Sequence, residues 1–253
     1  TAEAAKHVYE VKFTLNGKVK AMRYANRGGH VSLPTVQELL GEAYDARKTY
    51  TLAFGGGFSD ATAIDGNHTV AATVAVSCFN IATKDDWRAF GDLVRSGEGN
   101  LNAKLTVDLD FGSDIQKIGS ESTGYSGTFD GQGHTITIDW NTHGSDSYVT
   151  LFPFLIDATI KNLRVTGQMT SDSEPLSVFA LEARGTTTFS GCVSDVKITN
   201  GDKNDTYCAA GMVRAAYRKG KITFNDCIVG GDINGTVDNS SQNMGGFVCG
   251  QAD

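Results

Sequence analysis

Alternating apolar and polar residues open the chain and predict a β-hairpin. The alternation covers residues 9–15 and ends at Asn16-Gly17, a dipeptide typical of two-residue hairpin turns. Residues 19–24 supply the returning strand. We therefore expect a small mixed-β module over residues 1–76. Its other expected elements are one short helix and two later strands, over residues 36–46, 49–54 and 69–76.

An amphipathic helix is predicted next, over residues 83–94. Thr83 is a suitable N-cap, because its hydroxyl can accept a hydrogen bond from the first turn, and Asp86 suits the positive end of the helix dipole. Gly97 and Gly99 follow its end. One face of this helix is apolar, so we expect it to cover a hydrophobic surface. The apolar positions are Trp87, Phe90, Leu93 and Val94.

Beyond the helix, two apolar series recur at a shared interval of roughly thirty residues. The first series steps by 31, 29 and 35 residues through Phe129, Ile160, Phe189 and Phe224. The second steps by 27, 33 and 35 residues through Phe152, Phe179, Met212 and Phe247. Each repeat carries short strands bounded by Gly, Asn and Asp, which suit tight corners.

The repeats predict an all-β unit in residues 77–253, a parallel β-helix of about five coils. A single coil cannot bury its apolar face, so stacked coils must make the core. The helix at 83–94 caps the N-terminal end of this stack and hides an apolar edge. A flat two-sheet sandwich is the alternative, but it does not account for the shared period. The last coil, Gly245–Gly250, has no evident cap, so we expect further coils of the parent chain or another subunit to cover it.

Composition and charge exclude several functions. The chain has 22 Lys+Arg against 29 Asp+Glu, a net charge of −7, and no basic stripe, so we expect no nucleic-acid partner. No run of about 18 apolar residues occurs, so we expect no membrane-spanning segment. The chain starts at Thr1 without Met, which indicates a removed targeting segment or an excised fragment.

Three strings of the first module carry a likeness to a known family: Tyr9–Phe13, Gly28–Pro34 and Asp65–Thr73. In these strings the module resembles the Listeria–Bacteroides type of surface repeat. That resemblance implies a β-grasp-like domain that serves as a spacer on bacterial surface proteins.

A second set of strings lies in residues 78–253: Ile81–Phe90, Ala103–Asp110, Ile118-Gly119, Gly127–Ile136 and Ala158–Leu163. Together they resemble the start of GLUG-motif surface proteins, which are named for Gly-Leu-apolar-Gly coils. The string Gly245–Gly250 is the nearest to that motif. The resemblance implies an extracellular or cell-surface protein of bacteria that acts in adhesion without being an enzyme.

Candidate ligand-binding residues follow from that expected role. Exposed aromatic rings are a common platform for sugars, and basic side chains can meet acidic glycans. We expect glycans or host extracellular matrix as partners, although a passive spacer without a ligand remains an alternative. The candidate residues are Trp140, Tyr148, Tyr207, Tyr217, Arg214 and Arg218.

A polysaccharide-acting enzyme is the other alternative. Asp108 and Asp110 stand two apart on a predicted strand, so both carboxylates can face one glycosidic bond. With Asp114 they could also offer oxygens to Ca²⁺, but no calcium motif is present. His134 has no nucleophile motif around it and fits a structural turn. We therefore expect no catalytic residue, no cofactor and no metal.

Five cysteines cannot all pair within the chain, and none stands in a CxxC or Cys/His cluster. Cys192 and Cys227 occupy the same place in consecutive coils, 35 residues apart. Stacked strands lie about 4.8 Å apart, a separation that a disulfide allows. A disulfide and a buried pair of thiols are both compatible with this spacing.

Overall fold

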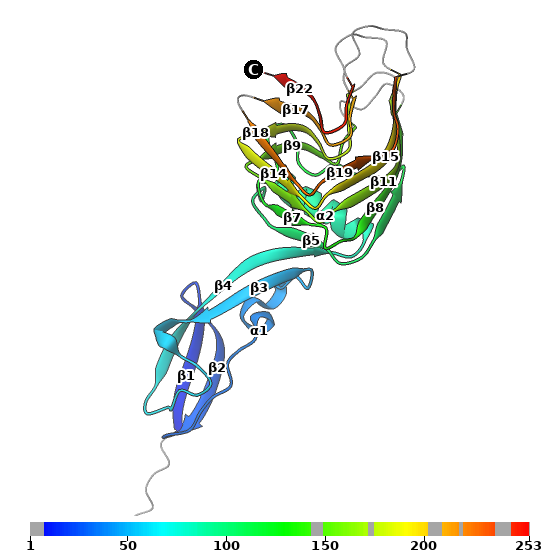
Figure 1. The fold of residues 1–253 in the computed structure, drawn as a ribbon. Helices are drawn as coiled ribbons and strands as arrows, with labels where there is room; N and C mark the ends of the chain where they lie inside the picture. Colours follow the sequence, from blue (N-terminus) through cyan, green and yellow to red (C-terminus); the bar gives the residue numbers. More distant parts are fainter. Residues whose placement is uncertain are drawn as a thin grey trace, which may run out of the picture. The chain divides into compact units, whose positions relative to one another are not determined.

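The computed structural model describes residues 8–142, 149–171, 175–201, 209–217, 220–235 and 244–252. The chain divides into two compact units, Thr1–Ser77 and Cys78–Asp253, each with its own hydrophobic core. Most described residues lie in strands, and helices are short (Figure 1). The prediction of a mainly β chain with parallel sheets is therefore confirmed.

The first unit begins with the predicted hairpin. Strands β1 (Val8–Leu15) and β2 (Lys18–Asn26) pair antiparallel. Asn16 and Gly17 between them have φ angles of 51° and 75°, the left-handed conformation that such a turn requires. Strand β1 also pairs in parallel with β4 (His68–Ile81). The hairpin prediction is confirmed.

The predicted helix at residues 36–46 is shorter than expected. Helix α1 (Val36–Leu40) begins with a capping box: Thr35 Oγ1 accepts from the Glu38 amide at 3.1 Å, and the Thr35 amide donates to Glu38 Oε2 at 2.8 Å. Gly41, at φ 57°, ends it, because that conformation cannot continue an α-helix. The two 3₁₀ turns of this unit are η1 (Gly41–Ala43) and η2 (Gly55–Gly57).

Strand β4 is longer than the strand predicted at residues 69–76. Its residues 68–72 pair with β1, and its last residues, 79–81, pair in parallel with β5 (Ala103–Leu105). Strand β3 (Lys48–Phe54) also pairs with β4. One strand therefore begins in the first compact unit and ends in the second.

The second unit opens with the predicted amphipathic helix, α2 (Lys84–Arg95). Thr83 is its N-cap and accepts a hydrogen bond from the Asp86 amide at 3.1 Å, as expected. Trp87 is fully buried, and its ring centroid lies 5.4 Å from that of Phe111 and 5.7 Å from that of Phe129. The apolar face of α2 thus packs on side chains of the first strands that follow it.

Four sheets supply the remaining strands of this unit, and within the unit the neighbouring strands of each sheet pair in parallel. Sheet A also continues through β4 to β1 and β2 of the first unit. Sheet A contains β5, β7 (Thr128–Asp130), β10 (Thr159–Lys161), β14 (Thr186–Ser190) and β18 (Lys221–Asn225). Sheet B contains β6 (Leu109–Gly112), β8 (Thr135–Thr142), β11 (Arg164–Ser171), β15 (Val193–Asn200), β19 (Ile228–Gly230) and β20 (Ile233–Gly235). Sheet C contains β9 (Phe152–Ile156), β13 (Ala180–Arg184), β17 (Val213–Tyr217) and β22 (Val248–Ala252). Sheet D contains β12 (Leu176–Ser177), β16 (Ala209–Ala210) and β21 (Met244–Gly245).

Strand pairing matches the first predicted apolar series. Phe129, Ile160, Phe189 and Phe224 are direct partners across β7, β10, β14 and β18. The first three are fully buried, and Phe224 stacks on Phe189 with ring centroids 5.3 Å apart. Successive repeats therefore contribute equivalent residues to one continuous core.

The second series needs one correction. Phe152 pairs with Ala180, so Phe179 of the next repeat is one residue out of register with Phe152. Leu151, whose amide donates to the carbonyl of Val178, is the residue in step with Phe179. Both Leu151 and Phe152 are fully buried, which is why the sequence pattern alone could not separate them.

Candidate functional site

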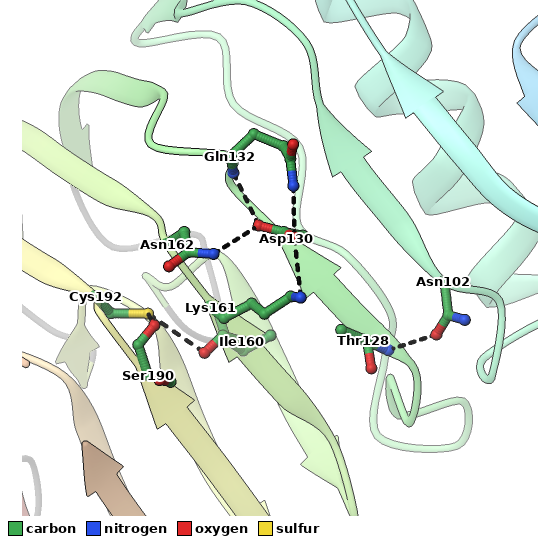
Figure 2. Close-up of polar contacts among 9 residues, drawn as sticks. All are labelled: Asn102, Thr128, Asp130, Gln132, Ile160, Lys161, Asn162, Ser190 and Cys192. Atoms are coloured by element: carbon green, nitrogen blue, oxygen red, sulfur yellow. Dashed lines mark hydrogen bonds and ion pairs between the residues drawn. The ribbon is translucent and has the colours of Figure 1, made fainter. Parts of the chain in front are cut away.

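Polar side chains repeat on the outer face of sheet A. Thr128, Thr159, Thr188 and Thr223 are direct neighbours on successive strands, and each is partly exposed. Asn102 extends the row, since its Oδ1 accepts a hydrogen bond from the Thr128 amide at 2.9 Å (Figure 2). The sheet thus presents a regular row of hydroxyl groups.

Beside that row lies the Asp130 cluster, formed by Asp130, Gln132, Lys161 and Asn162 (Figure 2). Asp130 Oδ1 accepts from the Gln132 amide at 3.0 Å and from Asn162 Nδ2 at 3.1 Å. Its Oδ2 lies 3.1 Å from Lys161 Nζ. Burial alone would raise the pKa of Asp130, but these hydrogen bonds hold that pKa below its ordinary value. The cluster ties β7 to β10 at the corner where both strands end.

The corner itself requires a left-handed backbone. Asn162, Gly191 and Asp226 follow β10, β14 and β18 with φ angles of 51°, 61° and 51°. Asn, Asp and Gly tolerate this conformation better than other residues. The three repeats that contain β10, β14 and β18 therefore leave sheet A through a residue in the same conformation.

Asp108 and His134 meet at the edge of the next sheet. His134 Nδ1 lies 3.0 Å from Asp108 Oδ1, which also accepts from the Thr135 amide at 2.9 Å. The Thr135 amide and His134 together lower the pKa of Asp108. Asp108 is therefore an exposed carboxylate, and its contacts connect the start of β8 to the residue just before β6.

Asp110, the second carboxylate of the predicted pair, stabilises the turn in which it lies. Asp110 Oδ1 accepts from the Gly112 amide at 3.0 Å. Glycoside hydrolysis by two carboxylates needs one of them as an acid with a raised pKa, whereas the pKa of Asp108 is lowered. The hydrogen bonds to Asp108 thus favour its ionised form.

A polar face also covers the outer side of sheet B, where β8, β11 and β15 lie side by side (Figure 1). Alternate residues of these strands point outward and stack in three columns. We call this set the sheet B face: Thr137, Asp139, Asn141, Thr166, Gln168, Thr170, Asp195, Lys197 and Thr199.

Contacts between strands order the sheet B face. Gln168 Nε2 donates to Asp139 Oδ1 at 2.7 Å, and the hydroxyls of Thr137 and Thr166 are 3.4 Å apart. Arg164, at the start of β11, pairs with Asp195 at 2.6 Å. The face therefore presents hydroxyl, amide and charged groups from three strands in a fixed array. No motif signals it in the sequence; only the period-two alternation within each strand does.

Trp140 does not lie where the sequence suggested. It was expected to offer an exposed ring, but it is only 5% exposed and belongs to the core. Ile136, Ile138 and Trp140 alternate along β8, so all three point inward. Lys117 Nζ stands 5.9 Å from the ring centroid. Trp140 is therefore a packing residue at the end of a strand.

The other candidate binders are described only in part. Arg214 lies on β17, is partly buried, and its Nε atom has no hydrogen-bond partner among the described residues. Tyr217 ends β17 and pairs with Ala252 through the backbone. The remaining candidates, Tyr148, Tyr207 and Arg218, lie outside the described residues.

Among the described residues, no group of three metal-ligating side chains occurs. Asp114, the third carboxylate of the calcium alternative, forms an ion pair with Arg88. Two hollows, of about 580 and 410 Å³, are lined by residues other than the sequence candidates. In the part of the chain that is described, no helix has the length and hydrophobicity to cross a membrane.

Comparison of the chain with protein-family models, with curated proteins and with solved structures found no match. A functional proposal for the chain therefore rests on the geometry of the described residues.

Proposed function

We propose that the chain is a non-enzymatic bacterial surface protein whose second unit is a parallel β-helix that presents the sheet B face to a glycan or to host matrix. The observation that carries this proposal is the array of outward hydroxyl, amide and charged groups on three paired strands. Such groups match the hydroxyls of a polysaccharide, which both donate and accept hydrogen bonds.

Strand order supports the β-helix. Each of sheets A, B and C takes its strands from successive repeats, and neighbouring strands are parallel. The apolar face of α2 packs on Phe111 and Phe129, as a cap on the first coil would. A sandwich of two antiparallel sheets would give none of these pairings.

Rigidity supports a binding role for the face. Gln168 is held by Asp139, and Asp195 by Arg164, so these side chains are already ordered before any ligand arrives. Ordered side chains lose less conformational entropy on binding. Extracellular placement rests on the resemblance to GLUG-motif and Listeria–Bacteroides-type surface proteins.

Apolar side chains at the far end of the stack support a further partner there. Ile228, Met244 and Phe247, on or beside the last strands, are 60%, 46% and 39% exposed. Further coils of the parent chain or another subunit would bury them, as the sequence leads us to expect.

A glycan and matrix-protein array with the purified chain tests the proposal. We expect binding to one ligand class, and we expect Lys197→Ala combined with Gln168→Ala to weaken it by about tenfold, a loss of roughly 1.4 kcal/mol. Lys221→Ala is the matched control, because Lys221 is an exposed lysine on a strand of sheet A.

Either of two results would overturn the glycan proposal. The first is silence across the array, which would favour a passive spacer. The second is an equal loss of binding in the Lys197→Ala/Gln168→Ala double variant and in Lys221→Ala, which would indicate binding through charge alone.

A polysaccharide-acting enzyme is the second candidate, and the contact between Asp108 and His134 is the observation in its favour. A carboxylate beside an imidazole can activate a water molecule. Release of reducing ends from a pectin-type polymer, abolished by Asp108→Asn and retained in Asp232→Asn, would establish it. An unchanged polymer across a broad panel would reject it.

A further inference from the structure

Cys192 and Cys227 occupy stacked positions at the corner between sheets A and B. Just before them, Ser190 pairs with Asn225. Just after them, Val193 pairs with Ile228, whose amide donates to the Cys192 carbonyl at 2.9 Å. The two cysteines are thus adjacent on neighbouring coils, and neighbouring strands lie about 4.8 Å apart. That spacing falls within the range of about 4.4–6.8 Å between the Cα atoms of a disulfide.

The two thiols also point the same way. Cys192 Sγ donates to the carbonyl of Ser190 at 3.6 Å, and Cys227 Sγ donates to the carbonyl of Asn225 at 3.3 Å. Each thiol therefore reaches back over its own corner by two residues. Cys192 Sγ also lies 3.4 Å from the carbonyl oxygen of Ile160 (Figure 2). Equivalent orientations on adjacent strands place the two thiols side by side, where they interact with each other.

The two thiols differ in exposure. Cys192 is fully buried, whereas Cys227 is partly exposed, and both are reduced in this structure. Burial raises the pKa of Cys192 to about 12, and the neighbouring Cys227 thiol adds to the rise. A small reagent would therefore meet Cys227 first.

We propose that Cys192 and Cys227 form a reversible disulfide between adjacent coils when the protein meets a small-molecule disulfide such as glutathione disulfide. The Cys227 thiolate attacks one sulfur of the reagent, a mixed disulfide forms, and one glutathione thiolate leaves. Cys192 then loses its proton and attacks the Cys227 sulfur, which expels the second glutathione thiolate. The two leaving thiolates take up the two protons, so two protein thiols are oxidised and one disulfide is reduced to two thiols.

The bond would join strands that already pair. Because it closes a loop of one coil, it restricts the unfolded chain and stabilises the fold. The inference concerns the core of the stack and is independent of any ligand for the sheet B face.

The test uses the full chain with Cys78, Cys208 and Cys249 replaced by serine, so that only the proposed pair remains. After incubation with glutathione disulfide and acid quenching, we expect both thiols to disappear and the mass to fall by that of two hydrogen atoms. The melting temperature should rise by about 5 °C or more and return to its starting value with reductant.

Two further variants and one peptide map show whether the disulfide joins Cys192 to Cys227. Cys227→Ser in the same background should show no thermal gain, and Cys192→Ser should give a glutathione adduct on Cys227. If the serine background does not fold, mapping of the wild-type chain should show the peptide that links Cys192 to Cys227. Two intact thiols in the folded protein, or a stable glutathione adduct as the only product, would overturn the proposal.

Discussion

At the scale of single residues, Asp130 resembles a binding-site carboxylate because several polar groups surround it, yet its contacts serve to connect β7 to β10. Four donors from two successive repeats reach its carboxylate, and its side chain is only 15% exposed. Its position in an Asp-Gly-x-Gly string was visible in the sequence, but its partners on β10 were not. They come from a segment about thirty residues away that only the folded register brings near.

We predict that Asp130→Ala lowers the free energy of unfolding by about 2 kcal/mol at neutral pH, because it removes hydrogen bonds to a charged group. The pKa of Asp130 is lower in the folded protein than in the unfolded chain. This contribution is therefore complete above about pH 4 and is lost as the pH falls through the folded value.

Denaturant titrations from pH 7 to pH 2.5 measure this effect, with Asp232→Ala as a control at an exposed acid of the same unit. The gap between wild type and Asp130→Ala should narrow at low pH. A gap that stays constant with pH would show that the ionised carboxylate does not contribute.

Trp140 marks the limit of sequence reasoning at this scale. Its position near a turn suggested exposure, yet the alternation Ile136, Ile138, Trp140 already indicated the inner face of a strand. The Cys192 and Cys227 alignment, by contrast, followed from the repeat alone and is reproduced by the strand register. The periodicity of the sequence therefore predicted the position of a side chain better than its proximity to a turn did.

At the scale of elements, the strands of sheet B pack so closely that one glycine is required. Gly167, in β11, has a φ angle of 113° and lies opposite Ile138 of β8. A Cβ atom built there would come within 1.9 Å of the Ile138 carbonyl oxygen. No ordinary side chain fits without separating the two strands.

We predict that Gly167→Ala costs about 3 kcal/mol of stability, because it combines backbone strain with a clash. Gly230→Ala is the matched control: it is a strand glycine in the same sheet, with its nearest contact at 3.5 Å. Thermal unfolding of both variants measures the difference. Equal melting temperatures would show that β8 and β11 can separate without cost.

Sequence patterns located most elements but not all their limits. The hairpin and α2 were predicted correctly, because local alternation and capping residues determine them. Helix α1 was predicted too long, since Gly41 adopts a left-handed conformation that the apolar spacing does not reveal. Strand β4 was predicted too short, because pairing of residues 79–81 with β5 depends on a distant segment.

At the scale of the whole molecule, burial declines along the core of the second unit. Phe129 and Phe189 are fully buried, whereas Phe224 is only partly buried. Ile228 on the neighbouring β19 is 60% exposed. The repeat period predicted the stacking of these residues, but no local pattern could show how much of the last repeat is covered.

We predict that Phe189→Ala costs about 4 kcal/mol and Phe224→Ala about half as much, in line with their burial. Chemical denaturation at two protein concentrations measures both. If a second subunit covers the last repeat, the effect of Phe224→Ala will grow with protein concentration while that of Phe189→Ala will not. Equal costs at every concentration would show that Phe224 is as well packed as Phe189.

The in-register stacking of equivalent positions also bears on how such a chain changes over evolutionary time. In sheets A and B, each inner strand pairs with the corresponding strand of the repeat before it and of the repeat after it. Duplication of one whole repeat within the stack would therefore give the new copy the same kinds of neighbours on both sides. Length can change by gain or loss of a unit of about thirty residues while the turns and core positions persist. Related proteins of this type should accordingly differ in repeat number more readily than in the pattern within each repeat.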